Sequence, residues 1–308
     1  MKALLFPGQG SQMVGMGSEF YKNYDLAKEL YQEADEKLNF KISKIILEGP
    51  DSELKLTQNT QPAILIVSYI IFNILIKEHG FKLNDFKYFA GHSLGEYSAL
   101  VCAKSLTFED ALFLLRERGK SMQEAVPVGD GGMLAVLGLE VEEVNQYISQ
   151  LNTSEVCEIA NDNANGQVIV SGNFKSINNL KEILKKNKKK SIPLPVSAPF
   201  HCSLMKSASD KMKEKIKAVN FKTPEPSIIT NVTAKPEANP ENIKNLLIEQ
   251  IYSKVRWRES ILFMVNSGIT DFVEIGPGKV LSGLVKRINA NSNSTSINTI
   301  NDVRSIIK

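Results

Sequence analysis

Short apolar runs and longer stretches with helical spacing alternate along the first third of the chain. Residues Lys2–Phe6 form an apolar run that stops at Pro7-Gly8, which is typical of a buried strand that leads directly into a loop. The spacing then predicts helices over 19–38, 61–77 and 94–104 and a second strand over 87–91. Because strand, loop and helix alternate, the pattern predicts an α/β fold with a parallel sheet.

The middle of the chain has a pattern of its own. The predicted elements are strands over 133–139, 156–161, 167–172 and 191–196 and helices over 141–151 and 177–186. Their βαββαβ order is the ferredoxin-like arrangement. Proline and glycine at 127–132 and prolines at 193–199 mark plausible hinges on either side. We therefore expect a small domain at 128–197, inserted in a large domain made of 1–127 and 198–308.

The last third returns to the style of the first. The pattern predicts helices over 205–219, 243–251, 257–266 and from 278 through 284, and strands over 228–231 and 271–275. From Asn289 the chain is polar except at Val303 and Ile306-Ile307, and the pattern leaves open whether a last strand or a short helix forms there.

Composition and charge exclude several classes of protein. The chain has 308 residues, 43% hydrophobic and 23% charged, which excludes a disordered or coiled-coil chain. A net charge of +3 provides no global field for nucleic acid. The longest apolar stretch, Ala63–Ile76, is shorter than the roughly 18 residues of a membrane span, so we expect a buried helix and no membrane.

The three cysteines and the first residues bear on the compartment. Cys102, Cys157 and Cys202 are far apart and form no metal-binding or disulfide pattern, which favours a reducing compartment and no metal site. The apolar run at the start is too short for a signal-peptide core. We expect a cytoplasmic protein.

Gly91-His92-Ser93-Leu94-Gly95 matches the pattern G-x-S-x-G and lies between a predicted strand and a predicted helix. In that context the glycines allow a tight strand-to-helix turn, and the serine hydroxyl projects as a nucleophile. The backbone N–H of Leu94 then supplies half of an oxyanion hole. The alternative is an ordinary glycine-serine turn.

A serine nucleophile needs a base, and the chain has three histidines. His79 lies beside a glycine that ends a predicted helix. His92 adjoins Ser93, and neighbours on a tight turn point apart, so we expect it to have a packing role. His201 lies at the junction of the two expected domains, where clefts are common, and is the candidate base.

The loop Pro7–Gln12 is rich in glycine but does not match a nucleotide-binding pattern. Position 13 is Met13, where G-x-G-x-x-G needs glycine, and no Gly-Lys-Ser/Thr follows. Such a loop after the first strand can instead present a backbone N–H to the oxyanion, as the second half of the hole.

Six segments, in order from the first strand to about Ile288, resemble the malonyl-CoA:acyl carrier protein transacylase family. The family has an α/β-hydrolase-like core with a ferredoxin-like insertion, which is also the fold that the pattern predicts. The segments are Pro7-Gly8-Gln9-Gly10-Ser11-Gln12, Gly91-His92-Ser93-Leu94-Gly95-Glu96-Tyr97, Arg116-Glu117-Arg118-Gly119-Lys120-Ser121-Met122-Gln123, Gly166-Gln167-Val168-Ile169-Val170-Ser171-Gly172, His201-Cys202-Ser203-Leu204-Met205 and Glu274-Ile275-Gly276-Pro277-Gly278.

The resemblance implies a role for each residue that matches the family's motifs. Ser93 would be the acylated nucleophile and His201 its general base. Gln9 and Leu94 would donate the oxyanion-hole N–H groups. Gln250 matches the position whose backbone carbonyl orients the histidine in place of a triad carboxylate.

The resemblance also implies how substrate is held. Arg118 would bind the free carboxylate of the malonyl group, and its planar fork suits a carboxylate, whereas an acetyl group would leave a buried charge unpaired. The alternative places Arg116 and Arg118 on a helix surface, paired with Glu117 or Glu109. Asn161 and Asn163 match asparagines that face the cleft from the small domain.

These residues imply an enzyme that transfers malonyl from malonyl-CoA to the phosphopantetheine thiol of acyl carrier protein, through a malonyl-serine, for fatty acid synthesis. We expect a monomer with no permanently bound cofactor. The lysine run over 185–190 is typical of a solvated helix end, with docking of the acidic carrier as the alternative. Two other functions stay open: a serine hydrolase on the same core, and an inert binding subunit.

Overall fold

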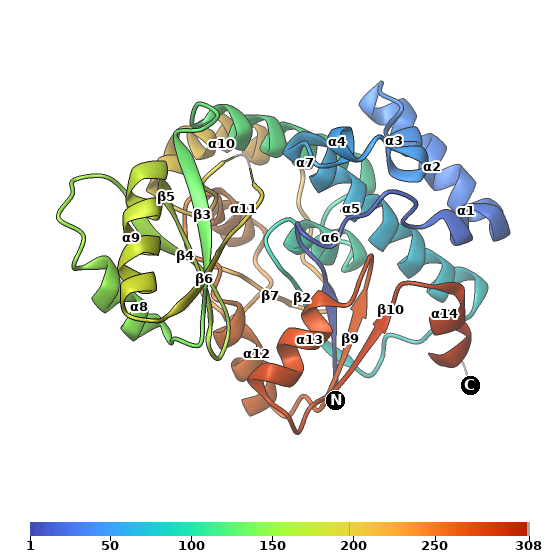
Figure 1. Cartoon of the computed structure of the whole chain (residues 1–308). Helices are drawn as coiled ribbons and strands as arrows, with labels where there is room; N and C mark the ends of the chain where they lie inside the picture. Colours follow the sequence, from blue (N-terminus) through green and yellow to red (C-terminus); the bar gives the residue numbers. More distant parts are fainter. Residues whose placement is uncertain (197, 307–308) are drawn as a thin grey trace.

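The computed structural model describes residues 1–196 and 198–306. The chain forms a large unit around one sheet and a small unit around another, and the two lie side by side (Figure 1). Two positions named in the predictions lie outside the described residues. They are residue 197, the last of the expected small domain, and Ile307, in the segment where the sequence left open a last strand or helix.

The large unit contains a six-stranded sheet with the order β10-β9-β1-β2-β7-β8. The neighbouring strands are parallel except for the last pair, β7 and β8. Phe6 and Gly91 are partners at the ends of β1 and β2, so the loops that follow both strands lie at one edge of the sheet. The strands are β1 (Lys2–Phe6), β2 (Phe86–Gly91), β7 (Ile228–Ile229), β8 (Pro236–Glu237), β9 (Asp271–Ile275) and β10 (Asn293–Ile297).

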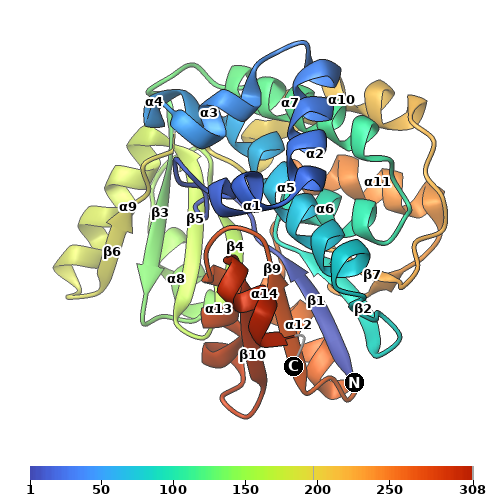
Figure 2. The ribbon, with the colours of Figure 1, turned by 90° about the vertical axis from the view of Figure 1, so that its right-hand side faces the viewer.

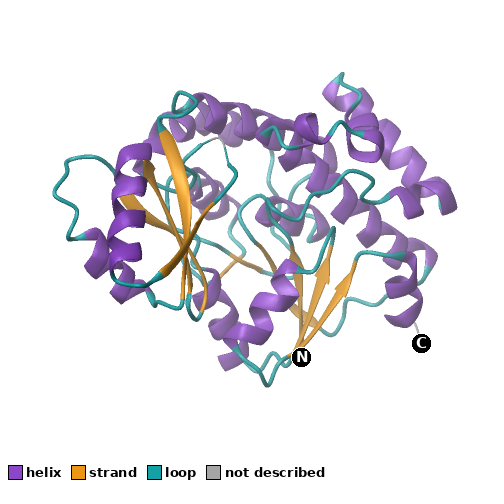
Figure 3. Cartoon of the chain, viewed as in Figure 1, coloured by secondary structure: helices purple, strands orange, loops and turns teal. Residues whose placement is uncertain are grey.

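Helices cover both faces of this sheet (Figures 2 and 3). Because successive side chains of a strand point to opposite faces, Leu4 and Phe6 enter one core while Ala3 and Leu5 enter the other. The helices of the large unit are α1 (Ser18–Asn23), α2 (Asp25–Leu38), α3 (Ile42–Glu48), α4 (Asp51–Leu54), α5 (Thr57–Asn73), α6 (Gly95–Cys102), α7 (Phe108–Glu124), α10 (Lys206–Ala218), α11 (Pro240–Gln250), α12 (Trp257–Asn266), α13 (Val280–Ile288) and α14 (Ile300–Ile306), with the π-helical turn η1 (Ile74–Glu78) and the 3₁₀ turn η2 (Ser203–Met205).

Helix α5 and the turn η1 confirm the expected buried helix. Within the described part of the chain, Thr57–Glu78 is the one helical stretch whose length and composition would suit a membrane span. The fold buries 89% of its most apolar window, as for the core helix of a globular domain.

The small unit has a four-stranded antiparallel sheet with the order β4-β5-β3-β6, and two helices pack on one face of it. The other face turns toward the large unit: Leu134 belongs to the core under the helices, while its neighbours Met133 and Ala135 join the main core. In chain order the elements are β3 (Gly131–Leu137), α8 (Val141–Ile148), β4 (Cys157–Ala164), β5 (Gln167–Asn173), α9 (Phe174–Lys186) and β6 (Lys190–Pro193).

A backbone β-bridge and a group of ion pairs join the two units. Asn161 of β4 forms an isolated parallel bridge with Val255, which lies just before α12. Three residues after Val255, Arg258 donates from Nε to both carboxylate oxygens of the buried Asp162, at 3.0 Å each, and its Nη1 donates to Glu140 Oε2 at 3.1 Å. We call Asp162, Arg258 and Glu140 the inter-unit clamp.

Several elements differ from the sequence-based predictions. The single helix expected over 19–38 is two helices, because Tyr24 is extended between them. Helices α3, α4 and α7 were not predicted as elements. The polar segment after Asn289 contains strand β10 at the edge of the sheet. The sequence left open whether a strand or a helix follows, and the structure has the helix α14 there, up to Ile306.

Candidate active site

The turn between β2 and α6 places Ser93 at the edge of the sheet, next to the loop that follows β1. Ser93 has φ of 53°, a left-handed conformation that is strained for a residue with a side chain. A Cβ on Gly91 would lie 1.9 Å from backbone atoms of Gly95, and one on Gly95 would lie 2.3 Å from the Phe6 carbonyl oxygen. The glycines of the motif are therefore required by close backbone packing, as a nucleophile turn predicts.

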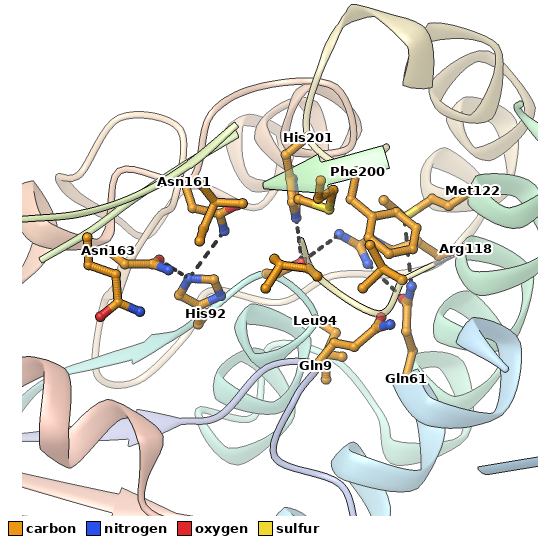
Figure 4. A pocket seen from close by; sticks show the side chains of 16 residues that line it. Gln9, Gln61, His92, Leu94, Arg118, Met122, Asn161, Asn163, Phe200 and His201 are labelled. Atoms are coloured by element: carbon orange, nitrogen blue, oxygen red, sulfur yellow. Dashed lines mark hydrogen bonds between the residues drawn. The ribbon is translucent and has the colours of Figure 1, made fainter. Parts of the chain in front are cut away.

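His201 contacts the Ser93 hydroxyl. Figure 4 shows His201 in the cavity that it lines together with Arg118. The Nε2 of His201 lies 2.8 Å from Ser93 Oγ, and its Nδ1 lies 2.8 Å from the backbone carbonyl oxygen of Gln250. Since a carbonyl only accepts, Nδ1 carries the proton and Nε2 is free to accept one from Ser93. Burial, and then the charge of Arg118, lower the pKa of His201 to about 3, so the ring is neutral at physiological pH.

Gln9 and Leu94 line the same cavity from two different loops. Leu94 directly precedes α6, so its N–H belongs to the positive end of that helix. Among the hydrogen bonds of the described residues, none uses the backbone N–H of Gln9 or Leu94. Both groups are therefore available to a substrate oxygen.

Arg118 reaches the cavity from α7 and is 1% exposed, which rules out the helix-surface alternative for this residue. Its Nη1 donates to Gln61 Oε1 at 2.7 Å, and its Nη2 donates to Gln250 Oε1 at 2.9 Å and to Ser93 Oγ at 3.1 Å. All three acceptors are neutral. No carboxylate of the described residues forms an ion pair with Arg118.

Two residues that the sequence analysis did not single out support the nucleophile. Asn231, just after β7, accepts from the Ser93 N–H at 2.7 Å and donates to the Gly91 carbonyl at 2.7 Å. Glu96 is 1% exposed and accepts at Oε2 from the Asn231 N–H at 3.0 Å and from Gln250 Nε2 at 2.8 Å. Burial raises the pKa of Glu96 to about 7. Glu96 follows the G-x-S-x-G motif directly, which is a local signal, whereas Asn231 has none.

The small unit contributes Asn161 and Asn163 of β4, and both line the cavity. Asn163 Oδ1 lies 2.9 Å from His92 Nε2, and Asn161 Nδ2 lies 3.4 Å from the same nitrogen. His92 packs against Trp257, and burial lowers its pKa. The asparagines therefore meet His92, not Ser93, and His92 links the nucleophile turn to the small unit.

The cavity measures about 230 Å³ and lies between the two units. Its lining includes the polar side chains of Ser93, His201 and Arg118. Apolar side chains also line it, and these are Met122, Met133, Ile169, Leu194, Val196 and Phe200. Among residues 1–196 and 198–306, no group of three or more His, Cys, Asp and Glu side chains is arranged to hold a metal ion.

Comparison with known proteins places this geometry in a family. The model of the family described as "Acyl transferase domain" matches residues 3–303. A malonyl CoA-acyl carrier protein transacylase of Bacillus subtilis is 48% identical over 289 residues, which are 93% of this chain and 90% of that protein.

Two solved structures are also similar to this chain. An acyl-carrier-protein-S-malonyltransferase from Bartonella henselae has a TM-score of 0.96 and 40% identity, and the match covers 99% of this chain and 98% of that one. A malonyl-transacylase in complex with a type II PKS acyl-carrier protein has a TM-score of 0.95 and 36% identity, over 99% and 98% of the two chains.

The matches run through both sheets and through the segments that carry Ser93, Arg118 and His201. At these identities and coverages the family is shown for the whole chain, and its α/β fold with one largely parallel and one antiparallel sheet is that of solved malonyltransferases. The chain belongs to the acyl transferase family, within which its relatives are malonyl CoA-acyl carrier protein transacylases.

Proposed function

We propose that this chain is a malonyl-CoA:acyl carrier protein transacylase that supplies fatty acid synthesis. The observation that carries the proposal is the position of Arg118: a buried guanidinium without a carboxylate partner donates to the hydroxyl of the candidate nucleophile, Ser93. An acyl group that ends in a carboxylate would supply the missing partner while its thioester lies at Ser93.

In the first half-reaction, Ser93 Oγ attacks the thioester carbonyl carbon of malonyl-CoA and its proton passes to His201 Nε2. The N–H groups of Gln9 and Leu94 stabilise the negative charge on the former carbonyl oxygen. When the intermediate collapses, the carbon–sulfur bond breaks, and His201 returns the proton to the CoA sulfur. Malonyl-Ser93 remains. The Gln250 carbonyl holds His201 in the required tautomer throughout.

In the second half-reaction, the phosphopantetheine thiol of acyl carrier protein replaces CoA. It gives its proton to His201 Nε2 and attacks the malonyl-Ser93 ester, and the collapse returns that proton to Ser93 Oγ. Arg118 holds the malonyl carboxylate in both halves. Asn161 and Asn163 bind substrate from the small unit. The chemistry needs no permanently bound cofactor.

The arrangement of the units supports a finer description of the fold. We infer an α/β-hydrolase-like large domain, residues 1–127 and 198–308, and a ferredoxin-like inserted domain, residues 128–197. The observed βαββαβ order and the strand order β4-β5-β3-β6 support the second description. We further infer a cytoplasmic monomer whose protein partner is acyl carrier protein.

The test is incubation with radiolabelled malonyl-CoA, with and without the carrier protein. We expect stable label on Ser93 that moves to the carrier when it is added, and Ser93→Ala should abolish the label while the fold is kept. Release of free malonate without carrier would indicate a hydrolase. No label on the wild-type chain would indicate an inert subunit, and label on the Ala variant would refute Ser93 as the nucleophile.

A further inference from the structure

A buried carboxylate lies one side chain away from the guanidinium of Arg118, and the two do not touch. Glu96 and Arg118 are each 1% exposed. The amide of Gln250 lies between them: its Oε1 accepts from Arg118 Nη2 at 2.9 Å, and its Nε2 donates to Glu96 Oε2 at 2.8 Å. Opposite charges in a buried site normally pair directly, so the separation calls for an explanation.

Its two neighbours fix the orientation of the Gln250 amide. A guanidinium has only donors, so the amide oxygen must face Arg118. An ionised carboxylate has only acceptors, so the amide nitrogen must face Glu96. That nitrogen also donates to the Ser93 carbonyl oxygen at 3.1 Å. An amide can satisfy a donor on one side and an acceptor on the other.

We propose that the side chain of Gln250 keeps Glu96 from pairing with Arg118, and so leaves the guanidinium charge available to the free carboxylate of the acyl group. This inference rests on the proposed function. It gives Gln250 a role in substrate specificity through its side chain, separate from the backbone carbonyl that contacts His201.

The charge on Glu96 then competes with substrate at a distance, and the competition depends on pH. Arg118 on α7 and Tyr97 on the same helix as Glu96 are the titratable groups that face it, whereas Gln250 on α11 and Asn231 are neutral. Burial raises the pKa of Glu96 to about 7. As the pH falls through this value, Glu96 loses its negative charge, and the attraction of Arg118 for a second carboxylate increases.

Two variants change the negative charge near Arg118: one adds a carboxylate beside it, and the other removes the charge of Glu96. Gln250→Glu keeps the backbone carbonyl but brings a carboxylate next to the guanidinium, so kcat/KM for acylation of Ser93 by malonyl-CoA should fall about tenfold or more. Acylation by acetyl-CoA, which has no carboxylate, should fall by a clearly smaller factor. Glu96→Gln is the matched control. Asn231 and Gln250 both donate to Oε2, so one amide oxygen can keep both bonds. Loss of the negative charge should then keep or raise the ratio of kcat/KM for malonyl-CoA to that for acetyl-CoA.

The wild-type enzyme provides a measurement that does not depend on how the variants fold. The ratio of kcat/KM for malonyl-CoA to that for acetyl-CoA should rise as the pH is lowered from 8 to 6, on the order of severalfold, and should be flat in Glu96→Gln. His201, with its pKa lowered to about 3, stays neutral over this range and does not contribute.

The outcomes separate this inference from the proposed function. A malonyl-Ser93 adduct on the wild-type enzyme, together with equal losses on both substrates in Gln250→Glu or a flat wild-type ratio between pH 6 and 8, would overturn the role of Gln250 alone. Absence of the adduct from wild type, measured by intact-protein mass spectrometry, would overturn the proposed function and this inference with it.

Discussion

Arg118 is buried on a helix of the large unit, although arginine is among the residues least often found inside a protein. Neutral groups accept from both of its terminal nitrogens, and its Nε has no partner among the described residues. Burial lowers the pKa of Arg118, but an arginine still keeps its charge at physiological pH. A charge held only by neutral groups is the condition under which a ligand carboxylate gains most from entering.

Replacing Arg118 with alanine should therefore change preference, not activity in general. The malonyl carboxylate would lose a buried partner, at a cost of about 2–5 kcal/mol in kcat/KM for malonyl-CoA. Acetyl-CoA should react as well as before or better. Arg116→Ala is the control on the same helix, because Arg116 donates to the Gln58 carbonyl and packs on Phe40, away from the cavity. Equal losses on both substrates in Arg118→Ala would assign Arg118 to the fold or to the CoA moiety.

At the scale of elements, the site depends on how closely β1, β2 and α6 approach one another. The first turn of α6 lies against the end of β1, and no side chain fits between them at Gly95. The glycine therefore sets the position of the helix that follows Ser93. Another glycine, Gly283, lies in the exposed middle of α13, where a Cβ would meet nothing within 4 Å.

The two glycines should respond in opposite directions to the same substitution. Gly95→Ala should lower the free energy of unfolding by about 1–3 kcal/mol, because the new methyl group overlaps the Phe6 carbonyl. Gly283→Ala should raise it by about 1 kcal/mol through helix propensity. Urea denaturation of both variants measures the difference. A neutral Gly95→Ala would mean that α6 can shift without cost, contrary to the close packing described above.

Elements with strong local signals were predictable, and those held by tertiary contacts were not. Strand β1 and helix α12 lie where the sequence predicts them, since proline, glycine and apolar periodicity mark their ends and faces. Strand β10 is polar and half-exposed, so it lacks the apolar run of a buried parallel strand. Tyr24 breaks a helix without glycine or proline, so the sequence pattern carries no signal for that break.

The same distinction applies to the site. Ser93 and His201 could be proposed because a motif and the scarcity of histidines point to them. Asn231 acts through a contact with a residue 138 positions away, which no local spacing records. The side chain of Gln250 was missed for the same reason, although its backbone position was anticipated from the resemblance.

At the scale of the whole molecule, the cavity lies between the two units and is lined by residues of both. The backbone bridge at Val255 and the inter-unit clamp lie directly beside Asn161 and Asn163, which reach the cavity from β4. Asp162 is 2% exposed, so the clamp includes a carboxylate that water does not reach. Breaking the clamp leaves that carboxylate without its partner.

We expect Arg258→Ala to lower the free energy of unfolding by about 3 kcal/mol, as for other buried pairs that lose one member. The double variant Arg258→Met with Asp162→Leu should recover most of this loss, because it removes both charges and keeps apolar volume. Thermal unfolding of the wild type and of the two variants tests this expectation. A single variant as stable as wild type would show that the clamp is not needed to hold the units together.

The isolated charge of Arg118 also affects how this protein would respond to selection for heat resistance. An apolar side chain at position 118 would avoid the desolvation of a guanidinium, so we expect Arg118→Met to raise the melting temperature while it removes the proposed carboxylate-binding group. A library screened only for thermal tolerance would therefore enrich durable variants that no longer discriminate between acyl groups. Engineering of this protein should therefore combine every stability screen with a measurement of the rate of malonyl transfer.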